Sequence, residues 1–110
     1  MSNLNNIWKP SHWVLLEMDD LNGDKFTRLL TSYVSKHDGV EGWRLGEPIT
    51  RTKTTPMHVE FTDTQKDTYV CDYNKEGLSE FLAKKYDEVA SEQGQLFNRK
   101  VTILTYGEGL

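Results

Sequence analysis

Alternation of apolar and polar residues predicts strands at five places along the chain. The first is a compact apolar run rich in strand formers, and the turn-prone segment Asp19–Gly23 closes it. Two later strands, separated by the turn-like Thr64–Asp67, have the pattern of a hairpin. The predicted strands are 12–18, 49–54, 57–62, 68–73 and 100–106. Trp43–Leu45 leads into the second of them, and Pro48 between the two indicates an edge position or a bulge.

Two further stretches show the spacing of a single helical face. The first begins at Asp24, which can cap a helix, and stops at Asp38-Gly39. Its apolar residues are Phe26, Leu29, Leu30, Tyr33 and Val34. The second follows Gly77 and stops near Gly94. Its apolar residues are Leu78, Phe81, Leu82, Tyr86, Val89 and Ala90. The sequence therefore predicts two helices.

The resulting order, β-α-β-β-β-α-β, predicts an α+β fold in which two helices pack on one face of a mainly antiparallel sheet. A ferredoxin-like arrangement with one added strand is the first choice. At 110 residues the chain has the size of one domain, so 1–110 is expected to form a single unit. Within it, residues 1–10 form an N-terminal arm that lies across the domain, and residues 107–110 form a frayed tail.

One face of such a sheet is covered by helices and the other is open, and an open face binds a ligand or pairs with a second subunit. In the first strand Val14, Leu16 and Met18 form the more uniformly apolar side, which places Trp13 on the open side. The same argument turns His58 outward. In the strand 68–73 the sequence leaves the outward side undecided. An open surface of Trp13, Tyr69, Tyr73, Arg51 and Lys53 would suit the stacking of bases or nucleotides, although aromatic residues at strand spacing also suit a core or a subunit interface.

Composition narrows the classes of partner. A net charge of −4 opposes general attraction to nucleic acid, which depends on many basic residues. The single cysteine, Cys71, has no partner for an internal disulfide, which fits a reducing compartment. The chain shows neither a secretion signal nor twenty consecutive apolar residues, so a cytoplasmic protein is expected.

Candidate chemistry is sparse. Asp20, Asn22 and Asp24 have the spacing of a calcium loop, but Lys25 stands where that loop requires glycine. The strong catalytic and phosphate-binding motifs are absent. We therefore expect no metal, no cofactor and no catalytic residue, and a binding protein is favoured over an enzyme. The alternative is a small nucleotide-binding or nucleotide-processing enzyme whose pocket uses His58, Glu60 and Arg51.

Three short segments carry a resemblance. They are Trp13-Val-Leu-Leu-Glu, Gly42-Trp-Arg-Leu-Gly-Glu-Pro-Ile49 and Thr68-Tyr-Val-Cys71. Together they resemble small, largely uncharacterised phage-encoded proteins, in which a Ser-Gly-Ser-like turn precedes Tyr-x-Cys. The chain departs from them at that turn, where Gln65-Lys66-Asp67 stands instead.

The resemblance implies a phage accessory protein that acts by binding, through inhibition or modulation of a host defence protein. Sequestration of a small anionic ligand is the other binding role that we expect, and a homodimer formed through the open sheet face is a further expectation. Trp43 and Arg44 follow a glycine and suit an exposed anchor for a partner. The expected binding residues are therefore Trp13, Trp43, Arg44, Arg51, His58, Tyr69 and Tyr73.

Overall fold

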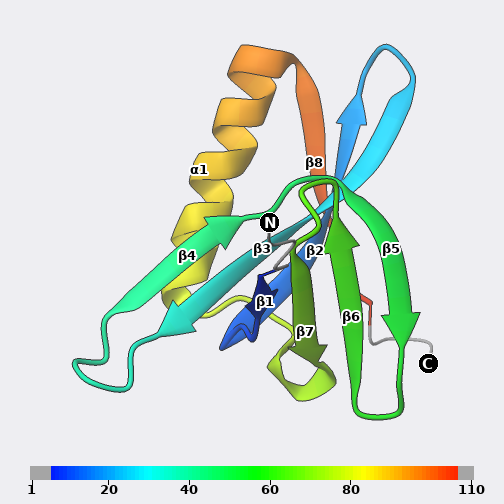
Figure 1. Ribbon diagram of the computed structural model, residues 1–110. Coiled ribbons are helices and arrows are strands. Elements are labelled where there is room, and N and C mark those ends of the chain that lie inside the picture. The colour runs from blue at the N-terminus through cyan, green and yellow to red at the C-terminus, as the bar shows by residue number, and fades with distance from the viewer. Residues whose placement is uncertain (1–5, 107–110) are drawn as a thin grey trace, which may run out of the picture.

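The protein is built of three layers, which are an outer β-sheet, a central β-sheet and one α-helix (Figure 1). The structure is a computed structural model that describes residues 6–106. Its elements are β1 (Ile7–Trp8), β2 (His12–Asp20), β3 (Asp24–Val34), β4 (Glu41–Leu45), β5 (Ile49–Thr54), β6 (His58–Asp63), β7 (Thr68–Asp72), the 3-10 turn η1 (Tyr73–Lys75), α1 (Glu80–Phe97) and β8 (Arg99–Leu104). The central sheet has the order β4-β3-β2-β8, and the outer sheet has the order β1-β7-β6-β5.

Strand β2 is buried on both of its faces. One face packs against α1, in a core made by Val14, Leu16, Met18, Leu30, Leu82 and Val89. The other face packs against the outer sheet, in a core made by Trp13, Leu15, Leu29, Val59, Phe61, Tyr69 and Cys71. The indole N–H of Trp13 also donates to the main-chain carbonyl of Asp72 at 2.7 Å. The central sheet is therefore the middle of the domain.

The helix predicted from Asp24 to Asp38 is wrong. The segment forms β3, which pairs antiparallel with β2 from Asp24 to Ser32. The N–H of Gly23 donates to the carbonyl of Asp20 at 2.7 Å and closes this hairpin. Leu29 faces the outer sheet while Leu30 faces α1, so both are buried although they are adjacent. Consecutive apolar residues in a strand covered on both faces imitate the spacing of a helical face.

The ferredoxin-like order with two helices on one face is also wrong, because residues 6–106 form eight strands in two sheets with one α-helix. The side of β2 that carries Trp13 is not open. It is covered by the outer sheet, and Trp13 is fully buried. The open sheet surface belongs instead to the far side of the outer sheet, where His58 and Glu60 alternate with the buried Val59 and Phe61.

Other predictions are confirmed. The second predicted helix is α1, which begins where the hydroxyl of Ser79 accepts the N–H of Leu82 at 3.1 Å. It continues past Gly94 to Phe97 and ends at Asn98, whose backbone is left-handed. The predicted hairpin is β6–β7. Strand β5 is an edge strand with a bulge between Ile49 and Arg51, as the nearby proline indicated.

Two residues of the predicted N-terminal arm form an edge strand of the outer sheet. Ile7 and Trp8 form β1, which pairs parallel with β7. Residues 1–5 of that arm and the predicted tail 107–110 lie outside the described residues.

Replacement of Gly23 by alanine tests the β2–β3 hairpin. Gly23 has a φ of +110°, a conformation that residues with a Cβ rarely adopt. We expect Gly23→Ala to lower the free energy of unfolding by about 1 kcal/mol, measured by urea denaturation. The matched control is Gly42→Ala, because Gly42 has no positive φ and a Cβ added there would meet no other atom within 4 Å. An equal loss of stability in both variants would contradict the assigned turn.

Candidate functional site

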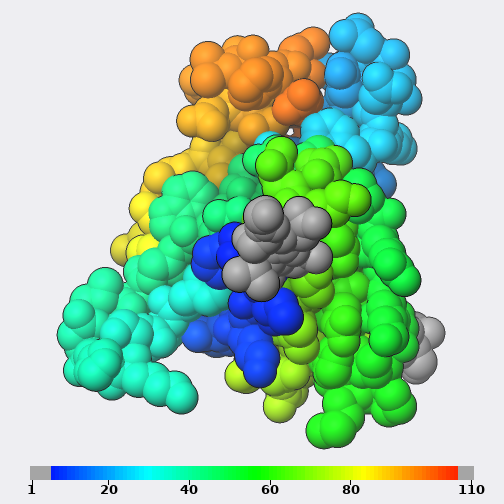
Figure 2. All heavy atoms as spheres, viewed as in Figure 1, coloured from blue at the N-terminus to red at the C-terminus, as the bar shows by residue number. Residues whose placement is uncertain are grey.

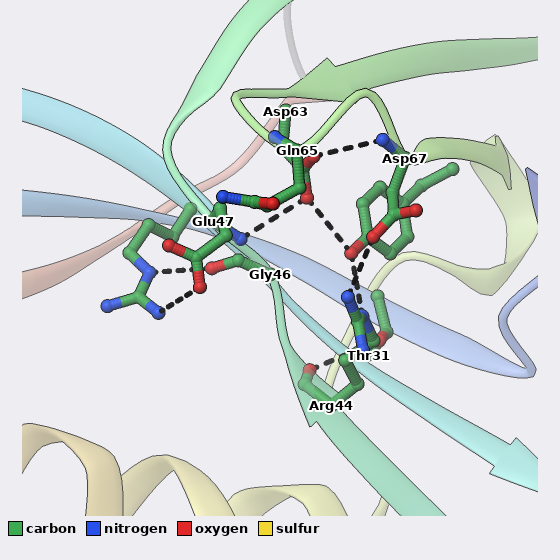
Figure 3. Close-up of polar contacts among 9 residues, drawn as sticks. Thr31, Arg44, Gly46, Glu47, Asp63, Gln65 and Asp67 are labelled. Carbon is green, nitrogen blue, oxygen red and sulfur yellow. Dashed lines mark hydrogen bonds and ion pairs between the residues drawn. The ribbon is translucent and has the colours of Figure 1, made fainter. Parts of the chain in front are cut away.

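Polar residues gather in two places, one buried between the sheets and one on the open surface of the outer sheet. The buried group, called here the inter-sheet cluster, consists of Arg44, Asp63, Asp67 and Tyr69 (Figure 3). Arg44 reaches from β4 to the outer sheet. Its Nε donates to the hydroxyl of Tyr69 at 2.8 Å, and its Nη2 pairs with Oδ2 of Asp67 at 2.8 Å.

Asp63 completes the inter-sheet cluster. Its Oδ2 accepts the hydroxyl of Tyr69 at 3.2 Å and the main-chain N–H of Glu47 at 3.3 Å. Its Oδ1 accepts the N–H groups of Gln65 and Asp67, at 2.9 and 3.1 Å, and so shapes the turn between β6 and β7. A buried carboxylate with this many donors is well satisfied. We infer a structural role for the cluster, which is to join the two sheets.

Gly46 is required by the same cluster. A Cβ added at Gly46 would lie 3.0 Å from the hydroxyl oxygen of Tyr69. The chain crosses from the central sheet to the outer sheet here, because Gly46 still donates its N–H to the carbonyl of Leu29 while Ile49 already begins β5. The close approach of strand and tyrosine ring therefore depends on the missing side chain.

The second group lies on the open side of the outer sheet and is called here the outer-face patch. Antiparallel pairing aligns Arg51 with Thr62 and Lys53 with Glu60 across β5 and β6. Residues of three strands line a hollow of about 240 Å³; they are Arg51, Lys53, Glu60, Thr62 and Thr68. An adjoining hollow of about 320 Å³ is lined by Lys9, Pro10, His58, Val70, Asp72 and Lys75. The outer-face patch comprises the residues of both hollows.

The charges of the outer-face patch are mostly positive. Within residues 6–106 the side chains of Arg51 and Lys53 make no hydrogen bond and no ion pair, although Lys53 acts electrostatically on Glu60. Nε2 of His58 lies 2.9 Å from Oε2 of Glu60, and this hydrogen bond, helped by Lys53, lowers the pKa of Glu60. On the other side Lys75 pairs with Asp72 at 3.5 Å. Exposed cations therefore flank the open surface.

The structure brings some of the predicted binding residues together and separates others. Arg51 and His58 both belong to the outer-face patch. Arg44 and Tyr69 meet in the inter-sheet cluster, where Tyr69 is fully buried. The remaining three lie elsewhere: Trp13 is fully buried, Tyr73 packs against the core between the sheets, and Trp43 is exposed on β4. With Trp13 and Tyr69 enclosed, the expected aromatic stacking surface is not formed.

Sequence reasoning missed Lys9 and Lys75, which enter the outer-face patch from outside the three strands that form its floor. Lys9 follows β1, and Lys75 ends η1. The position of Lys9 depends on the parallel pairing of β1 with β7, which joins segments about sixty residues apart in the chain. No local pattern signals that pairing.

Two features of the described residues bear on catalysis, namely the state of the Cys71 thiol and the arrangement of side chains that could bind a metal. Burial raises the pKa of the Cys71 thiol, so the thiolate needed for nucleophilic attack is disfavoured. Among residues 6–106 no three histidine, cysteine, aspartate or glutamate side chains are arranged to hold a metal ion. A mainly apolar hollow of about 490 Å³ lies beside the start of α1, where the carboxylate of Glu76 accepts the N–H of Tyr106 at 2.6 Å.

Removal of one hydroxyl tests the inter-sheet cluster. In Tyr69→Phe, the buried Asp63 and the half-buried Arg44 each lose a hydrogen-bond partner. We expect the free energy of unfolding to fall by about 1–3 kcal/mol. The control is Tyr86→Phe, which removes a half-buried hydroxyl that makes a long bond of 3.4 Å to the carbonyl of Val101. Equal losses in the two variants would show that the cluster does not join the sheets.

The Tyr33 ring lies beside Trp8, with ring centroids 5.6 Å apart. Its hydroxyl makes the free energy of unfolding depend on pH in the alkaline range. Burial raises the pKa of Tyr33 from 10.0 to about 12. A raised pKa in the folded state stabilises the fold below pH 10.0, and this stabilisation is lost as pH rises towards about 12. We expect the urea midpoint to fall across this range, and to fall less in Tyr33→Phe. Identical profiles would contradict the burial of this hydroxyl.

Similarity to known proteins gives no basis for assigning a function, so the function is argued from the geometry of the two polar sites. In residues 6–106 no helix combines the length and the apolar composition needed to cross a membrane. The chain matches no family model, no curated protein and no solved structure.

Proposed function

We propose that the protein is a non-enzymatic binding protein that holds an extended acidic segment of a partner protein against the outer-face patch. The observation that carries the proposal is the pair Arg51 and Lys53, which are exposed and make no ion pair within residues 6–106. Thr62 and Thr68 line the same hollow, and because their hydroxyls share one hydrogen bond at 3.2 Å, one hydroxyl hydrogen of the pair is left to donate to a carboxylate. On the other side of the patch Lys9 offers positive charge, and Lys75 adds to it although it is paired with Asp72.

The shape of the patch favours a chain segment over a free small molecule. The two hollows, of about 240 and 320 Å³, fall below or at the lower limit of small-molecule pockets, which is about 300 Å³. The two hollows adjoin, since His58 of one is hydrogen-bonded to Glu60 of the other, and they lie over the outer sheet, whose strands β5, β6 and β7 are drawn in green in Figure 2. Val70 belongs to the hollow beside His58 and gives an apolar contact between the cationic sides. An extended segment with acidic and apolar residues in alternation matches this surface.

The proposal also includes where the protein acts and what kind of partner carries the acidic segment. If the chain is a phage accessory protein, as its resemblance implies, the acidic segment belongs to a host protein that the chain inhibits or modulates in the cytoplasm. The alternative enzyme would use His58, Glu60 and Arg51 on a nucleotide. Only the contact between His58 and Glu60 favours it, since no phenylalanine, tyrosine or tryptophan lines the two hollows.

Charge reversal tests the proposal. The probe is a fluorescent peptide of alternating glutamate and valine, and its binding is followed by fluorescence anisotropy. We expect the double variant Arg51→Glu, Lys53→Glu to weaken binding by about tenfold or more, because it replaces attraction by repulsion at the hollow. Added salt should weaken binding to the unmodified protein.

The matched control is Lys84→Glu, Lys100→Glu, which changes the net charge equally at two exposed sites outside the patch. It should retain most of the affinity. Peptides with lysine in place of glutamate, inorganic phosphate and ATP serve as the other probes. Equal loss in both double variants, or binding of ATP in preference to the acidic peptide, would overturn the proposal.

A further inference from the structure

Strand β4 leaves one edge of the central sheet without a neighbour. It stands at the end of the order β4-β3-β2-β8, and Figure 1 shows it as the outermost strand of that sheet. Edge strands expose unpaired N–H and C=O groups and can pair with another chain, so proteins usually protect them with lysine, proline, bulges or short length. The two sheets have four edges, formed by β1, β5, β4 and β8, and these edges differ in their protection.

Three of the four edges carry such protection. β1 is two residues long. β5 has a bulge and exposes Arg51 and Lys53. β8 exposes Lys100. In contrast, β4 contains no lysine, proline or bulge along Glu41–Leu45.

The charged side chains of β4 do not protect its edge either. The guanidinium of Arg44 is turned into the inter-sheet cluster, where it meets Tyr69 and Asp67. The carboxylate of Glu41 accepts the hydroxyl of Ser79 at 2.8 Å, at the start of α1. β4 exposes apolar surface at Trp43, which is 42% exposed although Nζ of Lys85 lies 5.7 Å from its ring centroid, and Val40 just before the strand is 63% exposed. The side chain of Arg44 keeps 34% of its surface exposed.

The direction of the backbone groups in β4 follows from two hydrogen bonds at its ends. Gly46 donates its N–H to the carbonyl of Leu29, and the carbonyl of Val40 accepts the N–H of Ser35. In an antiparallel pair, alternate residues bond to the partner strand. Residues 40, 42, 44 and 46 therefore face β3, and the backbone groups of Glu41, Trp43 and Leu45 face the free edge.

From this geometry we infer that β4 is a homodimerisation edge, which pairs antiparallel with β4 of a second copy about a two-fold axis at Trp43. The free groups at 41, 43 and 45 are symmetric about that residue, so two copies present matching donors and acceptors. Trp43 then faces Trp43 of the second copy, and Glu41 faces Leu45. Gly42 lies opposite Arg44 of the second copy and leaves room for it to stay in its own cluster.

The dimer differs from the one expected at an open sheet face, and it leaves the outer-face patch free. A five-residue strand buries little surface, so we expect association in the micromolar range of concentration. Two central sheets would become one continuous sheet of eight strands, since each contributes four.

Sedimentation velocity over a range of concentrations of the full chain is the first test, with amide hydrogen exchange as its residue-level readout. We expect a monomer at low and a dimer at high concentration. Exchange at Trp43 and Leu45 should slow as the dimer forms, while exchange at Gly42 and Arg44, already bonded to β3, should stay unchanged. A monomer up to millimolar concentration, or a dimer without this alternation, would overturn the inference.

Charge substitution at Trp43 is the second test, and it is specific to the two-fold register. Trp43→Glu and Trp43→Lys should each be monomeric through like-charge repulsion, and an equimolar mixture should form a heterodimer. Circular dichroism confirms that the variants fold. Met57→Glu, at a residue 79% exposed outside β4, is the control and should dimerise normally. Dimers of Trp43→Glu alone, or no association in the mixture of folded variants, would reject the pairing.

Arg51→Glu, Lys53→Glu separates this inference from the proposed function. It should dimerise normally while losing the acidic peptide, and loss of the dimer in this variant would place the interface on the wrong surface.

Discussion

The absence of a polar face on β2 determines how many layers this protein has. Trp13, Leu15 and Leu16 are buried within one strand, and they project to both sides of the central sheet. Full burial of a large apolar side chain contributes about 1.5–3 kcal/mol, so both sides must be covered. The helix α1 covers one side and the outer sheet covers the other. The outer sheet has only one buried face and can therefore be polar on its far side, which is where the outer-face patch lies.

Local patterns predict the elements that are covered on one face only. α1 shows an apolar stripe, and β6 alternates regularly, so the outward direction of His58, Glu60 and Thr62 follows from sequence. β3 resembles a helix in its pattern because it is covered on both faces. Adjacent buried residues such as Leu29 and Leu30 remove the alternation by which a strand is recognised. The Asn22-Gly23 pair is the local signal for the hairpin, since asparagine followed by glycine favours such turns.

Sequence predicts the strand residues of the outer-face patch, but it does not predict the residues that other segments bring to the patch. Arg51 and Lys53 are two residues apart in one strand, so their shared side follows from strand geometry. The strand with Tyr69 gives no clear side from sequence, and only the inter-sheet cluster shows why its aromatic ring points inward. Arg44, expected as an exposed anchor, turns inward instead. Its direction depends on Asp67 and Tyr69, which are distant in sequence and belong to the other sheet.

The path of the chain through the two sheets has a consequence for folding. The hairpin β2–β3 and strand β4 enter the central sheet first, the outer sheet follows, and β8 returns to pair with β2. Glu17 of β2 therefore has no contact with Thr102, its antiparallel partner in β8, until most of the domain has been synthesised. Contacts between residues so far apart form slowly compared with hairpins. Until β8 and α1 are in place, the nascent chain exposes the apolar α1-facing side of β2, and exposed apolar surface of this kind favours aggregation during synthesis.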